Sequence, residues 1–185
     1  VHLLQCGCSP WRLKRHNKAG ADALKVLYRD MGWTWEEKHV ACHIDSGKRV
    51  DAICKNVMED FRPDAVDITV GCGACETYVT QATAREGNWL TDRLEQKKAD
   101  KHAQQCARAQ LNFMPAAFTT YGGWGQKIYA KLELEYEQRK KHEKEEGRSG
   151  WAAFRWKRDI LERMSIAIAK GNWALLDAHT PAPRV

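Results

Sequence analysis

The chain has 185 residues, of which 43% are hydrophobic, and its 30 basic and 24 acidic side chains give a formal net charge of +6. This length suits one domain with a core of its own, and no run of about 18 apolar residues occurs, so no transmembrane helix is expected. The basic excess favours a polyanionic partner without identifying it. Seven irregularly spaced cysteines indicate reduced thiols inside a cell. Because the chain begins with Val1 and no signal peptide follows, we interpret it as the C-terminal part of a longer protein.

The first predicted element is a helix over residues 17–31, with Asn17 as its cap and Gly32 as its end. Its apolar side chains form one stripe: Ala21, Leu24, Leu27, Tyr28 and Met31. Three strands are predicted over residues 33–41, 49–55 and 65–70, with turn-forming segments between them.

A long helix over residues 90–110 and a fourth strand over 112–120 come next. Two helices complete the chain, over residues 124–143 and 151–170, and the last is expected to stop at Gly171 and Asn172. This order predicts an α/β fold in which helices flank a central mixed sheet.

The strand over residues 65–70 contains an acid inside an apolar pattern. Asp67 and Thr69 face one side of the pleat, and the residues that face the other side are apolar: Val66, Ile68 and Val70. A buried carboxylate costs several kcal/mol unless a cation or hydrogen bonds compensate it. A second acid, Asp51, stands in the preceding predicted strand. Two acids on neighbouring strands are the layout of a divalent metal site.

Lysines occur on the helix that follows these strands. Leu90 and Leu94 share one helical face with Lys97, Lys98 and Lys101, because they are separated by three, four or seven positions. If the leucines dock against the sheet, at least one lysine should lean toward Asp67. The alternative is that all three lysines are solvated beyond the docked turn.

Five short motifs occur in an order that resembles a known family: Arg15-His16-Asn17, Arg49-Val50-Asp51, Val66-Asp67-Ile68-Thr69-Val70, Lys98-Ala99-Asp100-Lys101-His102, and the segment from Phe113 to Gly122. This series is similar to the restriction-like endonuclease domain at the C-terminus of reverse transcriptases from LINE-type retrotransposons and their protist relatives. The resemblance covers about residues 15–178, and the order and spacing of the motifs carry it.

The resemblance implies a basic Cys/His-containing segment over residues 1–16, a restriction-endonuclease-like core over 17–123 and a C-terminal helical extension over 124–185. It implies an intracellular, nuclear protein that nicks target DNA by phosphodiester hydrolysis, next to an upstream reverse transcriptase domain of the same polypeptide. No membrane and no small-molecule cofactor are expected.

The resemblance also implies roles for individual residues. Asp51 and Asp67, with Glu37 as a third acid, would hold Mg²⁺ or Mn²⁺. Glu36 and Glu37 face opposite sides of their strand, so only one can join the site, and the family spacing favours Glu37. Thr69 occupies the position of the usual lysine, two residues after the second acid, so Lys98 or Lys101 would replace that lysine.

The chain departs from the family pattern at three positions, where Val50, Asn17 and His102 replace the usual proline, aspartate and tyrosine. These departures leave open a degenerate, non-catalytic nucleic-acid-binding domain of the same fold. A basic ribonucleoprotein component and a structural domain that docks on the polymerase are further alternatives. A literal Arg62-Pro63-Asp64 also occurs, but Asp64 precedes Asp67 on the approach to the same strand, so we assign it to a turn or a surface charge.

The N-terminal segment contains a basic patch beside Trp11, and its members are candidate nucleic-acid contacts: Arg12, Lys14, Arg15, His16 and Lys18. A plain solvated segment is the alternative. Cys6 and Cys8 with His16 would form the remainder of a zinc knuckle that binds Zn²⁺, although the spacing is unusual and a fourth ligand is unassigned.

Overall fold

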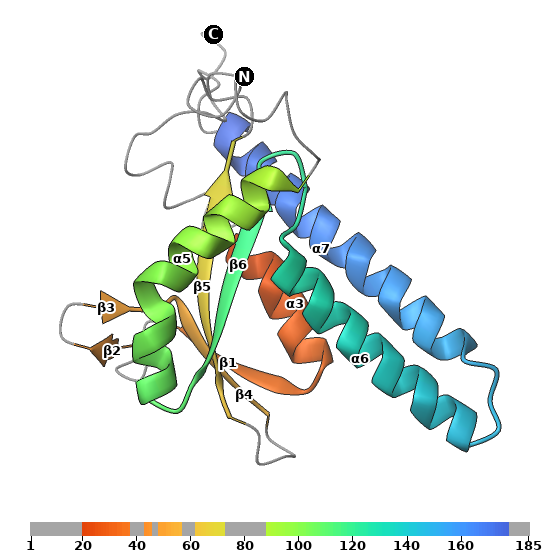
Figure 1. Cartoon of the computed structure of the whole chain (residues 1–185). Coiled ribbons are helices and arrows are strands. Elements are labelled where there is room, and N and C mark those ends of the chain that lie inside the picture. Colours follow the sequence, from red (N-terminus) through yellow and green to blue (C-terminus); the bar gives the residue numbers. More distant parts are fainter. Residues whose placement is uncertain (1–19, 38–42, 46–47, 57–61, 73–87, 178–185) are drawn as a thin grey trace, which may run out of the picture.

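The computed structural model describes residues 20–37, 43–45, 48–56, 62–72 and 88–177. Within these ranges the chain is mixed α/β, with a four-stranded sheet, a separate two-stranded sheet and four helices (Figure 1). In chain order the elements are α3 (Asp22–Asp30), β1 (Trp33–Glu37), β2 (His43–Asp45), β3 (Lys48–Arg49), β4 (Ala52–Asn56), β5 (Asp64–Gly71), α5 (Trp89–Arg108), β6 (Asn112–Thr119), α6 (Gln126–Glu145) and α7 (Trp151–Asp177).

The main sheet has the strand order β1-β4-β5-β6. Strands β1, β4 and β5 pair antiparallel, whereas β5 and β6 pair parallel. A parallel pair needs a crossover connection, and α5 lies in that connection. The small antiparallel pair β2–β3 forms a sheet of its own.

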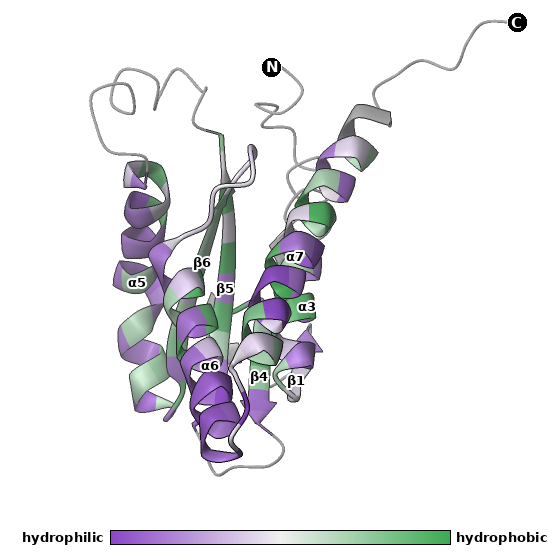
Figure 2. Cartoon of the chain, turned by 90° about the vertical axis from the view of Figure 1, so that its right-hand side faces the viewer, coloured by the Kyte–Doolittle hydropathy of each residue, from purple (hydrophilic) through white to green (hydrophobic). Residues whose placement is uncertain are grey.

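Helices cover both faces of the main sheet (Figures 1 and 2). Helices α3, α6 and α7 pack on one face and enclose the larger core, to which β5 contributes Val66 and Ile68. Helix α5 packs on the other face over two smaller clusters, in which Cys106 contacts strand residues and Leu90 and Leu94 pack with Ala117. The helices of the expected C-terminal extension therefore share the larger core with α3 and the sheet.

The predicted order of helices and of the strands of the main sheet is confirmed over the described residues, but the small sheet β2–β3 was not predicted. Four residues of the predicted apolar stripe are buried, Ala21, Leu24, Leu27 and Tyr28, and Met31 is partly buried. Gly32 adopts the left-handed φ of +79° that glycine tolerates at a helix end. The predicted capping residue Asn17 lies outside the described residues. Within the described ranges, none of the helices combines the length and the hydrophobicity that a membrane span requires.

Two predicted boundaries are wrong. The strand expected over 49–55 is divided, because Arg49 pairs with His43 in the small sheet and β4 begins only at Ala52. Helix α7 continues past Gly171 to Asp177. A glycine inside a helix costs only about 1 kcal/mol relative to alanine. Here Asn172 Nδ2 donates a hydrogen bond to the Thr120 carbonyl at 2.7 Å, so tertiary contacts support the helix beyond the glycine.

Candidate functional site

Asp67 lies in the middle of β5, with its side chain 5% exposed. It faces α5, as the strand pattern predicts. Two side chains of α5 approach its carboxylate. Lys98 Nζ donates a hydrogen bond to Asp67 Oδ1 at 2.9 Å, and His102 Nε2 lies 3.2 Å from Oδ2. Lys98 and His102 are four positions apart, so they share one face of the helix.

Asp51 lies at the bend just before β4. The antiparallel register pairs Ala52 with Val66, and its continuation by one residue places Asp51 opposite Asp67. Two hydrogen bonds hold Asp51 there, since its backbone N–H donates to the Val66 carbonyl at 2.9 Å and its Oδ2 accepts from the Ile68 N–H at 2.6 Å. The two predicted acids therefore meet on one face of the sheet, although Asp51 reaches it from a bend and not from a strand.

The environment of Asp67 disfavours its charged form. Burial raises the pKa of Asp67 from 3.8 to about 6; the Lys98 ammonium opposes this rise, and the neighbouring Asp51 carboxylate adds to it. Desolvation and a like charge both penalise an ionised carboxylate. A site of this kind gains from any further cation between the two acids.

The hydrogen bonding of the two carboxylates indicates whether they could hold a hard divalent cation. Although Asp67 Oδ2 is 3.2 Å from His102 Nε2, this buried oxygen meets no donor in hydrogen-bonding geometry within the described part of the chain. No group of three or more His, Cys, Asp or Glu residues is arranged to hold a metal ion in the same part of the chain. Mg²⁺ is bound in proteins by one or two carboxylates and several waters, so the pair Asp51 and Asp67 fits that ion.

Glu37 does not join the two aspartates. It pairs with Ala52, whose other neighbour is Val66 in the larger core, so Glu37 lies on the sheet face opposite Asp67. Its carboxylate contacts Lys25 Nζ of α3 at 3.1 Å. The adjacent Glu36 therefore faces the α5 side of the sheet, where it pairs with a lysine of β4. The expectation that Glu37 is the third acid is thus wrong in this arrangement.

The three lysines considered for the site differ in direction and exposure on α5. Leu90 and Leu94 are buried against the sheet, as expected. Lys98 leans toward β5 and is 25% exposed. Lys97 and Lys101 lie on the exposed surface of the helix.

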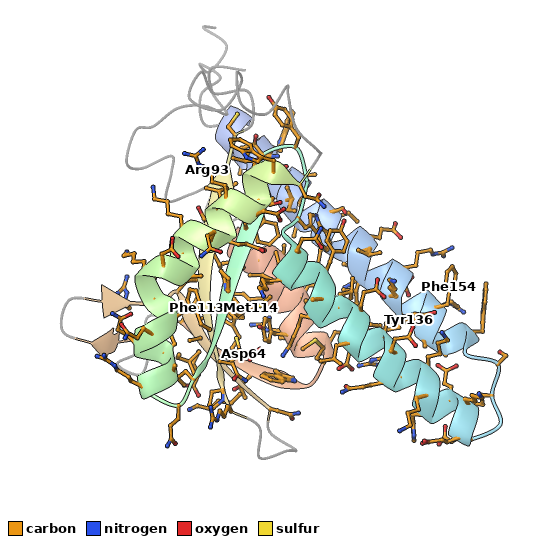
Figure 3. All side chains as sticks on the ribbon, viewed as in Figure 1. Asp64, Arg93, Phe113, Met114, Tyr136 and Phe154 are labelled. Carbon is orange, nitrogen blue, oxygen red and sulfur yellow. The ribbon has the colours of Figure 1, made fainter. Side chains whose placement is uncertain are left out.

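Sequence reasoning missed one residue and misplaced another. In the sequence, His102 stands out only as the replacement of a tyrosine, although its i+4 spacing from Lys98 places it on the same helical face. Asp64 is not a turn or surface residue. It is buried between the sheet, α3 and α6 (Figure 3), where it accepts hydrogen bonds from Tyr28 at 2.9 Å and Lys131 at 2.7 Å.

The predicted basic patch, Arg12, Lys14, Arg15, His16 and Lys18, and the cysteines Cys6 and Cys8 lie outside the described residues. Comparison of the chain with protein-family models finds no matching family, and comparison with curated proteins finds no match.

Proposed function

We propose that this chain is a metal-dependent DNA endonuclease domain with a restriction-endonuclease-like core, which nicks target DNA for a retroelement reverse transcriptase. The main observation that supports the proposal is the position of three side chains. Asp51, Asp67 and Lys98 come from a bend, a strand and a helix, and they converge on one face of the sheet. Two acids that can hold a divalent metal, with a fixed positive charge beside them, are groups that can catalyse phosphodiester hydrolysis.

Asp51 and Asp67 would hold Mg²⁺ or Mn²⁺. A divalent ion bound there would lower the pKa of a water and neutralise charge that develops on the phosphate. Asp51 is oriented for this role by the Ile68 N–H, which fixes one of its oxygens at 2.6 Å. The other member of the pair, Asp67, is oriented by Lys98.

Lys98 would stabilise the phosphate undergoing attack. Its Nζ is anchored to Asp67 at 2.9 Å, yet the side chain is 25% exposed. An ammonium in this position can contact a phosphate oxygen without losing its anchor, and it acts there as a compact point charge. Such preorganised charge contributes to catalysis because it requires no rearrangement during the reaction.

A plasmid-nicking assay with Mg²⁺ or EDTA tests this function. We expect relaxed circles only with the metal, and we expect Asp51→Asn and Asp67→Asn each to lower the rate by at least about 100-fold. Glu37→Gln is the matched control, because it neutralises an acid on the opposite face of the same sheet, and it should retain nearly full activity. Activity that survives both aspartate substitutions would exclude this site.

A second candidate function is a non-catalytic nucleic-acid-binding domain of the same fold. The observation that favours it is the approach of Lys98 and His102 to Asp67, because two potentially cationic groups can compensate a buried carboxylate without any metal. In that case the chain binds DNA equally well with Mg²⁺ and with EDTA, and no nicking appears under either condition.

A further inference from the structure

The exposed basic and acidic side chains of α5 lie on two different flanks of the helix. Cations and acids alternate along the sequence, whereas around the helix they lie in two adjoining arcs, with Asp100 about 20° from Arg93. One flank contains the exposed basic residues Arg93, Lys97, Lys101 and Arg108, which we call the basic stripe. The acids Asp92 and Asp100 are also exposed, and they lie on the other flank with Gln96, which donates a hydrogen bond to Asp100 at 2.7 Å.

Helical spacing shows how narrow the basic stripe is. The four residues stand at intervals of four, four and seven positions, which places them within about 80° of arc on the helix. Lys98 lies about 60° beyond Lys101 in the same direction of rotation, between the stripe and Asp67. The stripe is therefore continuous with the candidate active site.

The stripe also has a length that suits contact with a duplex. Arg93 and Arg108 are separated by about 22 Å along the helix axis. A duplex advances about 3.4 Å along its axis for each base pair, so the stripe is about as long as six base pairs. Arg93 projects from α5 on the side turned away from α6 (Figure 3), and its guanidinium lies 5.4 Å from the centre of the Trp89 ring.

The composition of this flank favours a nucleic acid over a protein partner. The large hydrophobic residues that are exposed in the described part of the chain all lie outside α5: Tyr121, Tyr129, Leu134, Trp151, Phe154, Ile166 and Trp173. Protein interfaces are enriched in buried aromatic anchors, whereas contacts to a phosphate backbone use arginine and lysine.

We propose that one strand of double-stranded DNA binds along the basic stripe of α5. Binding along the stripe places this strand next to Lys98 and Asp67. This inference rests on the proposed nuclease function for the chemistry at the end of the stripe, and it adds the direction in which the substrate lies. Arg93, Lys97 and Arg108 contact phosphates on either side of the reacting one. These contacts position the duplex and carry no sequence information.

The test measures binding apart from cleavage. Fluorescence anisotropy with a labelled 30-base-pair duplex in EDTA compares wild type with the triple variant Arg93→Gln, Lys97→Gln and Arg108→Gln. The matched control removes three exposed charges from the other side of the molecule, by Lys144→Gln, Arg155→Gln and Arg158→Gln. We expect the stripe variant to bind at least about tenfold more weakly near physiological salt, with the slope of log K against log salt reduced by about 3. The control should stay within about twofold of wild type.

Two results would overturn the inference: an unchanged affinity of the stripe variant, or an equal loss in both triple variants, which would indicate general attraction by net charge. Nicking is measured separately on the wild type. If the wild type never cuts DNA but the stripe variant alone loses affinity, the DNA track on α5 is supported and the proposed nuclease function fails.

Discussion

Opposing effects determine the pKa of the Asp67 carboxyl group. Burial and Asp51 favour the neutral acid, Lys98 favours the carboxylate, and the resulting pKa of about 6 exceeds the ordinary 3.8. The folded chain therefore binds this proton more tightly than the unfolded chain does. For this group alone, stability is highest at low pH, falls as the pH rises from about 4 to about 6, and is constant above that range.

The substitution Asp67→Asn removes this dependence on pH. The free energy of unfolding of the variant, relative to wild type, should increase by up to about 3 kcal/mol between pH 4 and pH 7. Urea unfolding of both proteins at several pH values measures the difference. A difference that does not vary with pH would contradict a raised pKa at Asp67.

We expect Lys98 and Lys101 to affect catalysis differently, because Lys98 donates a hydrogen bond to Asp67, whereas Lys101 lies on the exposed surface of α5. At saturating DNA, Lys98→Met should lower the nicking rate by about 100-fold. Lys101→Met removes a charge from the exposed face of α5, so it should raise KM and leave the rate at saturation within about fivefold of wild type. The opposite ranking would show that Lys101 is the catalytic lysine.

At the scale of elements, α5 and the start of α6 meet at a single buried acid. Glu95 is 6% exposed, and its Oε1 accepts a hydrogen bond from the Lys127 N–H at 3.2 Å. Burial raises the pKa of Glu95 to about 7. An acceptor in the first turn of a helix satisfies a backbone N–H that lacks a partner within the helix. The close approach depends on Gly125, where an added Cβ would collide with the Glu95 carboxylate and lie 3.3 Å from the Ala117 carbonyl.

We therefore expect Gly125→Ala to lower the free energy of unfolding by about 1–3 kcal/mol. Chemical denaturation of the single variants, Gly125→Ala and Glu95→Ala, and of the double variant measures the coupling. The double variant should lose at least about 1 kcal/mol less than the sum of the single losses, because the collision disappears with the carboxylate. Strict additivity would show that the strain at position 125 has another source.

At the scale of the whole molecule, an ion pair between Asp64 and Lys131, whose side chains are 8% and 18% exposed, connects the sheet to two of its covering helices. Asp64 of β5 accepts hydrogen bonds from Tyr28 of α3 and from Lys131 of α6. The Lys131 ammonium also lies 3.9 Å from the centre of the Trp33 ring in β1. Removal of one partner from a buried pair leaves the other charge uncompensated, which is strongly destabilising.

Lys131→Met should accordingly lower the free energy of unfolding by about 3 kcal/mol. Lys140→Met is the control on the same helix, because Lys140 and its partner Glu137 are 50% and 60% exposed, and exposed pairs contribute about 0–1 kcal/mol. Thermal unfolding of the two variants compares them directly. Equal effects would show that Asp64 does not depend on its lysine.

Local periodicity in the sequence was sufficient to predict most elements and the faces of two of them. The stripe of α3 and the alternation of β5 follow from repeats of 3.6 and 2 residues, so Asp67 could be assigned to the side opposite Val66 and Ile68. The docking of Leu90 of α5 against the sheet and the approach of one lysine to Asp67 could be predicted in the same way.

Only the tertiary structure decided which residues of different elements meet. The exclusion of Glu37 depends on two successive strand registers, the burial of Asp64 depends on α3 and α6, and the continuation of α7 depends on contacts far along the chain. Periodicity within a segment determines the relative directions of its side chains. It contains no information on strand register, or on the distant charges that compensate a buried group, because long-range packing determines both.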